Sequence, residues 1–465
     1  MPGPVVPPEP RSGQPSRALL LGLLVLVLLL NSCTPAGSTA APPEPGTSSP
    51  GGIAPSSPPT LGSSPSGENA TNPTATSAAA TSAYQGWPAG ARATLTALAA
   101  SARQHDRSAW MRQLSTRDPA IGVAGRRLYE NLAALPLVAL TLTPQPRTLE
   151  LSPARRALLG DRAWVQQVAV SWRVTHDVGP AEQLLWVTFV DEGGAARVAG
   201  TSDGPPEPAA TPLWTLGTLH AHTGRATTVL AAAGQSSESW VRRGDAAAAA
   251  VRRRLAANPL LTWSGGLVVE LPATQQAFEQ VLGVSPGSYA QLAAVAWPVG
   301  PDAATAGVRI VVNPAQSRLL DAEALDVLVT HEATHVATRS AASSGPTWLV
   351  EGFADYVAYD AHPRTSAAAA RELLSRVSSQ GPPARLPGDA DFTPSAPELA
   401  LTYAESWLAC RFLAETYSPG QLTQLYARVD GGDGLAPSLQ AVFDLTEAEL
   451  TAGWQRYLVA AARRR

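Results

Sequence analysis

The residues best suited to chemistry are two histidines one helical turn apart with a glutamate between them. The stretch LDVLVTHEATHVATRS, residues 325–340, places His331, Glu332 and His335 in the pattern H-E-x-x-H. Apolar residues recur through it at helical spacing, at Leu325, Leu328, Val329 and Val336. Helical neighbours four residues apart lie about 5–6 Å apart at Cβ, so both imidazoles can reach one zinc ion at about 2 Å. Glu332 then lies beside the metal without binding it.

A hydrolytic zinc site needs a third protein ligand and an open fourth position. The following stretch, GPTWLVEGFADYVAYD, contains two carboxylates that could provide it. Pro346 suits the first turn of a helix. Glu351 lies 16 residues after His335, and Asp355 follows one turn later. A second helix packed against the first would therefore bring a carboxylate to the two imidazoles.

This second stretch resembles the gluzincin metallopeptidases, in particular the Peptidase MA-like group with its signature W-L-x-E-G-x-A-x-Y. The matching residues are Trp348, Leu349, Glu351, Gly352, Ala354 and Tyr356. The resemblance implies that Glu351 is the third ligand of one Zn²⁺ per chain. It also implies that Asp355 accepts a hydrogen bond from His331 and fixes the tautomer of that imidazole.

Two other classes of metallopeptidase do not match. Thr338 and Ala341 stand where the metzincin pattern requires Gly and His. The only methionines are Met1 and Met111, so the G-x-M-E-N motif of membrane alanyl-type aminopeptidases is missing. The first observation rejects the metzincin pattern, and the second argues against an aminopeptidase because the usual amine anchor is missing.

The resemblance implies hydrolysis of a peptide or protein substrate. Zinc lowers the pKa of its bound water, and Glu332 is the expected general base, which then passes the proton to the leaving amine. A further donor is expected at the developing oxyanion. Tyr403 and His362 are the candidates, and for Tyr403 a packing role at the start of a helix is the competing interpretation.

The N-terminus predicts an exported lipoprotein. Arg11 and Arg17 precede an apolar run of 13 residues, 18–30, which is shorter than the roughly 20 residues of a spanning helix. Leu30-Asn31-Ser32-Cys33 resembles the lipobox of bacterial lipoproteins, which implies a signal peptide over 1–32 and lipidation of Cys33. An ordinary cleaved signal or an uncleaved anchor is the alternative. Each places the rest of the chain outside the cytoplasm, and lipidation would anchor it to the outer face of the cell membrane.

Three segments follow the predicted signal peptide, and the expected fold class is α+β. Residues 33–83 are rich in Pro, Ser, Thr and Ala, which predicts a disordered tether. Residues 84–205 read as helices followed by strands and resemble the small α+β cone of NTF2-like domains. Residues 213–465 are expected to form a zincin-like peptidase domain with a mixed sheet, the H-E-x-x-H helix and a helical C-terminal lobe.

Composition limits the partners. The net charge of −3 comes from 34 basic and 37 acidic residues, and no run of arginines resembles a nucleic-acid arm. The triplet Arg252 to Arg254 is expected to be a solvated helix face. His220 and His222 are expected to be a partly exposed strand pair, and Cys410 a buried helix residue. The oligomeric state stays open.

The rival hypothesis is a non-catalytic envelope protein. In it the metal site stabilises a binding or scaffolding lipoprotein that keeps a metallopeptidase fold. Glu332 argues for the enzyme, because a structural zinc site needs no general base.

Overall fold

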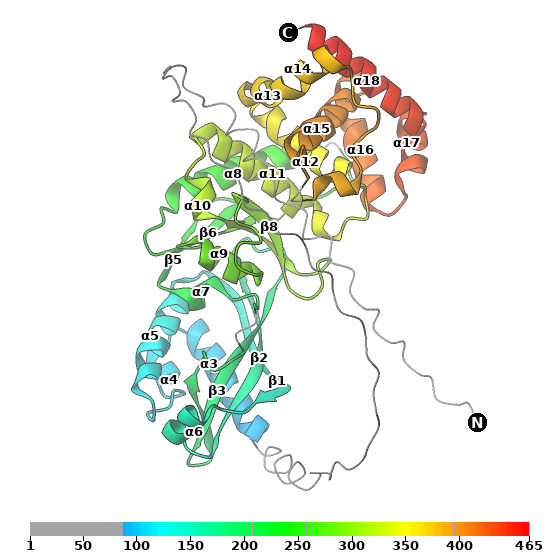
Figure 1. The fold of residues 1–465 in the computed structure, drawn as a ribbon. Helices are drawn as coiled ribbons and strands as arrows, with labels where there is room; N and C mark the ends of the chain where they lie inside the picture. The colour runs from blue at the N-terminus through cyan, green and yellow to red at the C-terminus, as the bar shows by residue number, and fades with distance from the viewer. Residues whose placement is uncertain (1–86, 206–207, 257, 264, 394–395, 465) are drawn as a thin grey trace, which may run out of the picture.

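The computed structural model describes residues 87–464 apart from 206–207, 257, 264 and 394–395. The chain has the expected α+β fold, in three tiers: a first α+β region, a five-stranded sheet and a helical lobe (Figure 1). The predicted signal peptide, the tether and Cys33 lie outside the described residues. Within the described residues, no helix combines the length and the apolar character needed to cross a membrane.

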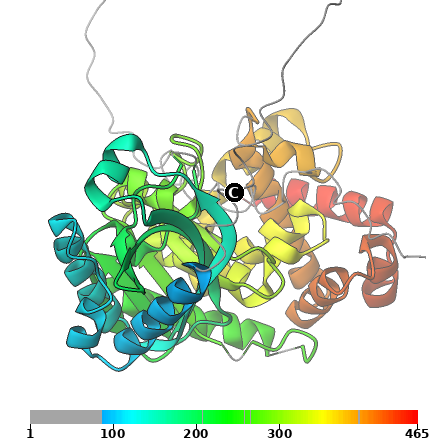
Figure 2. The ribbon, with the colours of Figure 1, turned by 90° about the horizontal axis from the view of Figure 1, so that it is seen from below.

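The first region packs helices on an antiparallel sheet. Its elements are α3 Trp87–Arg103, α4 Arg107–Met111, α5 Pro119–Ala134, β1 Leu137–Leu149, α6 Pro153–Leu159, β2 Ala163–Val174, β3 Ala181–Glu192 and β4 Ala195–Gly200. The strands are ordered β1-β2-β3-β4. The alternating residues predicted to share one strand face are all buried: Val168, Val170, Trp172 and Val174. That face of the curved sheet wraps around α3 (Figure 2).

Strand β1 was not predicted. It contains Pro144 and Pro146, and a register shift interrupts its pairing with β2 between Pro144 and Thr148. Proline lacks an N–H for the ladder, so it is tolerated on an edge strand such as this one and disguises the strand in the sequence.

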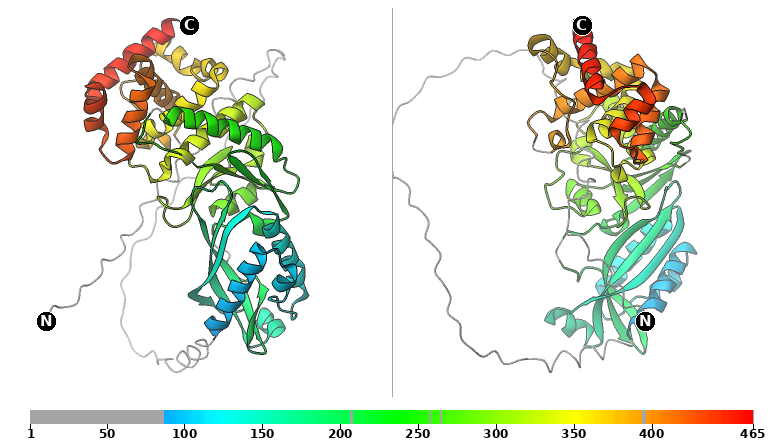
Figure 3. Two further views of the ribbon diagram at one scale, coloured as in Figure 1. Left: turned by 180° about the vertical axis from the view of Figure 1, so that it is seen from behind. Right: turned by 90° about the vertical axis from the view of Figure 1, so that its right-hand side faces the viewer.

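The second sheet is mixed, as expected, with the strand order β5-β6-β7-β9-β8. Its elements are α7 Leu213–Leu216, β5 Leu219–Thr223, β6 Thr227–Ala232, α8 Glu238–Leu255, β7 Leu267–Leu271, α9 Gln275–Leu282, β8 Ala294–Val299, β9 Gly307–Val312 and α10 Pro314–Ser317. The three central strands are parallel, and β5 and β8 are antiparallel edges. Helix α8 and the H-E-x-x-H helix α11, Ala322–Thr338, cover one face of the sheet (Figure 3).

The rest of the chain is helical, as expected. It comprises η3 Ser340–Ala342, α12 Thr347–Ala361, α13 Pro363–Ala369, α14 Arg371–Gln380, η4 Asp389–Phe392, α15 Leu399–Thr416, α16 Pro419–Asp430, α17 Leu435–Phe443 and α18 Glu447–Arg463. Helices α12 and α15 pack closely in one apolar core with α8 and α11.

The opposite face of the second sheet packs against the first region. Alternate side chains of its strands, including Leu230, Val268 and Val311, join the same apolar cluster as Trp172 and Phe189 of the first sheet. The first region and the second sheet therefore share a hydrophobic core.

Candidate metal centre

Helix α11 carries the two histidines, and local signals define both of its ends. Asp321 caps its N-terminus by accepting a hydrogen bond from the Ala324 N–H at 2.8 Å. Arg339 ends it in the left-handed conformation, with φ of 50°. The buried hydroxyls of Thr330, Thr334 and Thr338 each donate to the carbonyl four residues earlier. The helix can thus be buried along most of its length without leaving these polar groups unpaired.

Helix α12 brings Glu351 to this site. Asp389 of η4 accepts hydrogen bonds from the Thr347 N–H at 3.0 Å and its hydroxyl at 2.8 Å, which anchors the first turn. A Cβ on Gly352 would lie 2.4 Å from the carbonyl oxygen of Ser406 in α15. The helix backbones therefore touch at the residue after Glu351, and a side chain there would push α12 away from α15.

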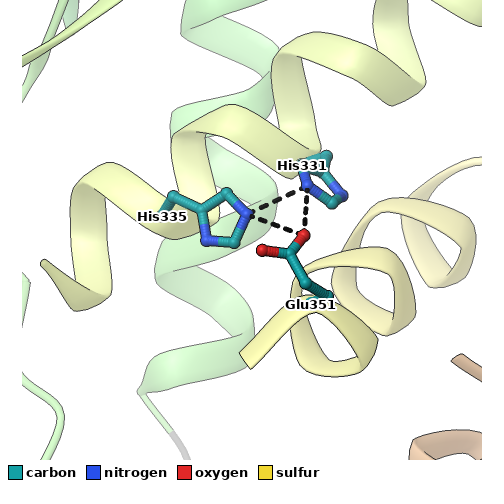
Figure 4. Close-up of side chains that lie close together, drawn as sticks. All are labelled: His331, His335 and Glu351. Atoms are coloured by element: carbon teal, nitrogen blue, oxygen red, sulfur yellow. Dashed lines mark hydrogen bonds and ion pairs between the residues drawn. The ribbon is translucent and has the colours of Figure 1, made fainter. Parts of the chain in front are cut away.

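The three expected ligands converge, as Figure 4 shows. The Nε2 atoms of His331 and His335 are 2.9 Å apart, and Glu351 Oε2 lies 3.5 Å from each. A tetrahedral ion with bonds of about 2.0–2.1 Å holds its ligand atoms about 3.3 Å apart. The three atoms thus form a triangle of the size that a zinc-like cation requires. We call these residues the metal group.

The environment of Glu351 favours binding of a cation at this triangle. The residue is fully buried, and neither carboxylate oxygen has a hydrogen-bond partner among the described residues. Burial acts to raise its pKa, but the imidazoles of His335 and His331 outweigh burial and hold the pKa at about 2. The contacts to the two imidazoles are long, at 3.5 Å, so they compensate the cost of the buried carboxylate incompletely. A cation between Glu351 and the two imidazoles would remove that cost.

Asp355 occupies the position that the resemblance implies for it. Its Oδ1 lies 2.8 Å from Nδ1 of His331, and both side chains are buried. Burial acts to lower the pKa of His331, but the charge and hydrogen bond of Asp355, together with Glu351 and Glu332, outweigh burial and raise that pKa. When Nδ1 donates to Asp355, the Nε2 lone pair is free for a metal. No such partner is found for Nδ1 of His335 among the described residues.

Glu332 lies beside the metal group, and its side chain contacts strand β8. Its Oε2 accepts a hydrogen bond from the backbone N–H of Ala296 in β8 at 2.6 Å. The side chain is buried, and this burial raises its pKa above the ordinary value of a glutamate. Sequence reasoning missed Ala296, because a backbone donor on a distant strand leaves no signal in residue types.

The two candidate oxyanion donors are not members of the metal group. Tyr403 is buried and packs edge to face on Phe392, with ring centroids 5.3 Å apart. This contact agrees with the packing interpretation. His362 ends α12, and its Nε2 lies 3.1 Å from the hydroxyl of Thr330. It lines a cavity of about 300 Å³ together with residues of α8 and α11, and none of the three ligands lines that cavity.

The structure also shows the exposure of the other histidine pair, of Cys410 and of the arginine triplet. His220 and His222 are exposed on the edge strand β5, and Cys410 is buried in α15, as expected. The prediction that Arg252 to Arg254 form a solvated face is wrong for Arg254. Its side chain is 16% exposed, and it pairs with Asp360 of α12 and lies over the ring of Tyr356. The long arginine stem allows burial against an aromatic ring while the charge stays paired.

Among known proteins, no family model, curated protein or solved structure matches this chain. The geometry of the described residues therefore carries the functional argument. It brings together a buried His-His-Glu group able to hold a metal ion.

Proposed function

We propose that the protein is a zinc-dependent peptidase that acts outside the cytoplasm, anchored as a lipoprotein. The single observation that carries the proposal is the triangle of ligand atoms in the metal group, with Glu332 beside it. The donor set supports zinc, because two imidazoles and one carboxylate with an open fourth position are typical of catalytic zinc sites.

The residues have distinct roles in this proposal. His331, His335 and Glu351 would hold the ion, which supplies acidity to water and to the substrate carbonyl when bound. Asp355 keeps the imidazole of His331 in the tautomer that can bind. Glu332 removes a proton from the attacking water and delivers it to the leaving amine. Its raised pKa suits both steps, because a base works best when its pKa lies nearer the operating pH.

The position of β8 supports a peptide as substrate. It is the terminal strand of its sheet, and Ala296 directs its N–H outward to Glu332 instead of to another strand. An extended peptide is the ligand that such an edge accepts, through backbone hydrogen bonds. A peptide paired with β8 would pass beside Glu332.

The test compares Glu332→Gln with the wild-type protein. We expect hydrolysis of a mixed peptide substrate to fall about 10²–10⁴-fold, with one zinc per chain retained. Glu405→Gln is the matched control, because burial also raises the pKa of Glu405 in α15 and its side chain is outside the metal group. Undiminished hydrolysis in Glu332→Gln would rule out the role of this glutamate. Zinc bound without hydrolysis in the wild type would favour the scaffold.

A further inference from the structure

A buried ion cluster joins the first region to the second sheet. Arg309 of β9 donates to both carboxylate oxygens of Asp177, from Nε at 3.1 Å and from Nη2 at 2.8 Å. Its Nη1 donates to Glu270 of β7 at 2.8 Å. The guanidinium also lies 3.7 Å from the ring centroid of Trp172 in β2. We call Arg309, Asp177 and Glu270 the arginine clamp.

The clamp is strongly directional. Asp177 lies in the turn between β2 and β3, 132 residues before Arg309. Two parallel N–H···O bonds from a planar guanidinium fix both the distance and the angle of that turn relative to β9. Both side chains are wholly buried, so solvent does not weaken the pair.

A backbone contact lies beside the clamp. The N–H of Gly307, the first residue of β9, donates to the Pro180 carbonyl at 2.6 Å. A Cβ on Gly307 would lie 2.6 Å from the carbonyl oxygen of Gly179. A Cβ on Gly179 would lie 2.7 Å from that of Thr305. The two regions therefore meet backbone to backbone. A clash at this contact could not be relieved by moving a side chain.

The clamp and this backbone contact together form the junction, which lies one strand away from the backbone group that binds Glu332. Arg309 stands opposite Trp297 in the register of β9 with β8, so Ala296 is the adjacent residue. The Ala296 N–H holds Glu332. The turn between β8 and β9 also reaches α11, because Arg339 donates to the carbonyls of Ala304 at 2.9 Å and Ala306 at 2.7 Å.

We propose that the first region is a positioning element of the active site. The pair of Arg309 and Asp177 holds the β8–β9 hairpin in the position where the Ala296 N–H binds Glu332. Arg309 and Asp177 are thus positioning residues for the general base and for a peptide bound along β8. The proposal rests on the proposed function, since it gives Glu332 a reaction to serve. It assigns the first region a role within catalysis.

Two substitutions disturb the junction by different means. Asp177→Asn removes one charge from the clamp and leaves its size unchanged. Gly307→Ala leaves all charges in place and forces the hairpin away from Gly179. The controls are Asp118→Asn, which breaks an ion pair with Arg155 inside the first region, and Gly122→Ala, where a Cβ meets no atom within 4 Å.

Hydrogen–deuterium exchange, zinc content and steady-state kinetics are measured on the full chain. In both junction variants we expect exchange in β8 to rise roughly tenfold while α11 and α12 keep their protection. We expect kcat per bound zinc to fall about 10- to 100-fold, because small displacements of catalytic groups have effects of this size. Both controls should leave β8 exchange and kcat unchanged, even where they lower the Tm.

The outcomes separate positioning from plain stabilisation. Junction variants that lower the Tm but keep wild-type β8 exchange and kcat per zinc would overturn the proposal. If Asp177→Asn does not fold, Gly307→Ala decides the matter by the same readouts. If the wild type hydrolyses no peptide, the proposed function fails, and exchange in β8 still shows whether the junction positions that strand.

Discussion

Among the residues that the structure describes, the arginine clamp and the metal group are both buried clusters of charged side chains, and they differ in how completely the protein pairs them. In the arginine clamp, Arg309 binds Asp177 and Glu270 through three short hydrogen bonds. In the metal group, neither oxygen of Glu351 has a hydrogen-bond partner among the described residues. The contacts of Glu351 to the two imidazoles are long, at 3.5 Å. Burying an incompletely paired charge is costly, and a ligand that completes the pairing offsets that cost. The difference distinguishes the clamp, whose charges are paired by the protein, from the metal group, which could hold an ion.

Removing the centre of the clamp should give the largest loss of stability. Arg309→Met leaves two carboxylates buried without their cation, so we expect the free energy of unfolding to fall by about 3–5 kcal/mol. Chemical denaturation of the metal-free protein measures it. Arg155→Met is the matched control: Arg155 also binds two aspartates, but its side chain is 23% exposed. An equal loss in both variants would contradict the contrast between complete burial and partial exposure.

Zinc should act on the metal group alone. Free zinc at about 1,000 times its Kd raises the free energy of unfolding by about 4 kcal/mol, because only the folded chain holds the three ligands together. Thermal unfolding with zinc and with a chelator measures this. We expect Glu351→Gln to abolish the response and Glu270→Gln, in the clamp, to keep it. A response that survives Glu351→Gln would place the metal elsewhere.

The partner of His331 should have a smaller effect. Asp355→Asn removes the carboxylate that holds Nδ1 at 2.8 Å. Losing such a partner typically weakens metal affinity about 10- to 100-fold, and competition with a chromophoric chelator measures it. Unchanged affinity would show that packing of the imidazole fixes its orientation without Asp355.

Glu405 of α15, which is half-buried and lies outside both clusters, gives the smallest effect, confined to high pH. Burial raises the pKa of Glu405 to about 7 from an ordinary value of 4.5. The folded state therefore prefers the protonated form, and the resulting stability, complete below about pH 4.5, is lost as pH rises through 7. We expect Glu405→Gln to raise the denaturation midpoint at pH 8 and to change it little at pH 4.5. Equal shifts at both pH values would contradict this assignment.

The sequence predicted the metal group because its chemistry is local. His331 and His335 are one helical turn apart, so their spacing predicted a shared metal. Glu351 lies in a short motif on the next helix, and the resemblance of that motif to gluzincins implied it as the third ligand. The α+β class and the mixed sheet followed from apolar patterns in the same way. Such signals survive without knowledge of distant contacts.

The clamp could not be predicted for the opposite reason. Asp177 and Arg309 are far apart in the chain, and each reads as an ordinary charged residue of a turn or a strand. Arg254 was misread because its pairing with Asp360 depends on the packing of α8 against α12. Backbone groups such as the Ala296 N–H carry no signal in residue types, so only the three-dimensional structure shows them.

The most direct test of the central claim is the zinc content of the purified protein by elemental mass spectrometry. Wild type is measured beside His335→Ala and Glu351→Ala, with the exposed pair His220→Ala and His222→Ala as the matched control. The proposed zinc site predicts about one zinc per chain in the wild type and in the control, and none in the two ligand variants. A folded wild type without zinc after supplementation, or zinc retained in Glu351→Ala, would contradict it.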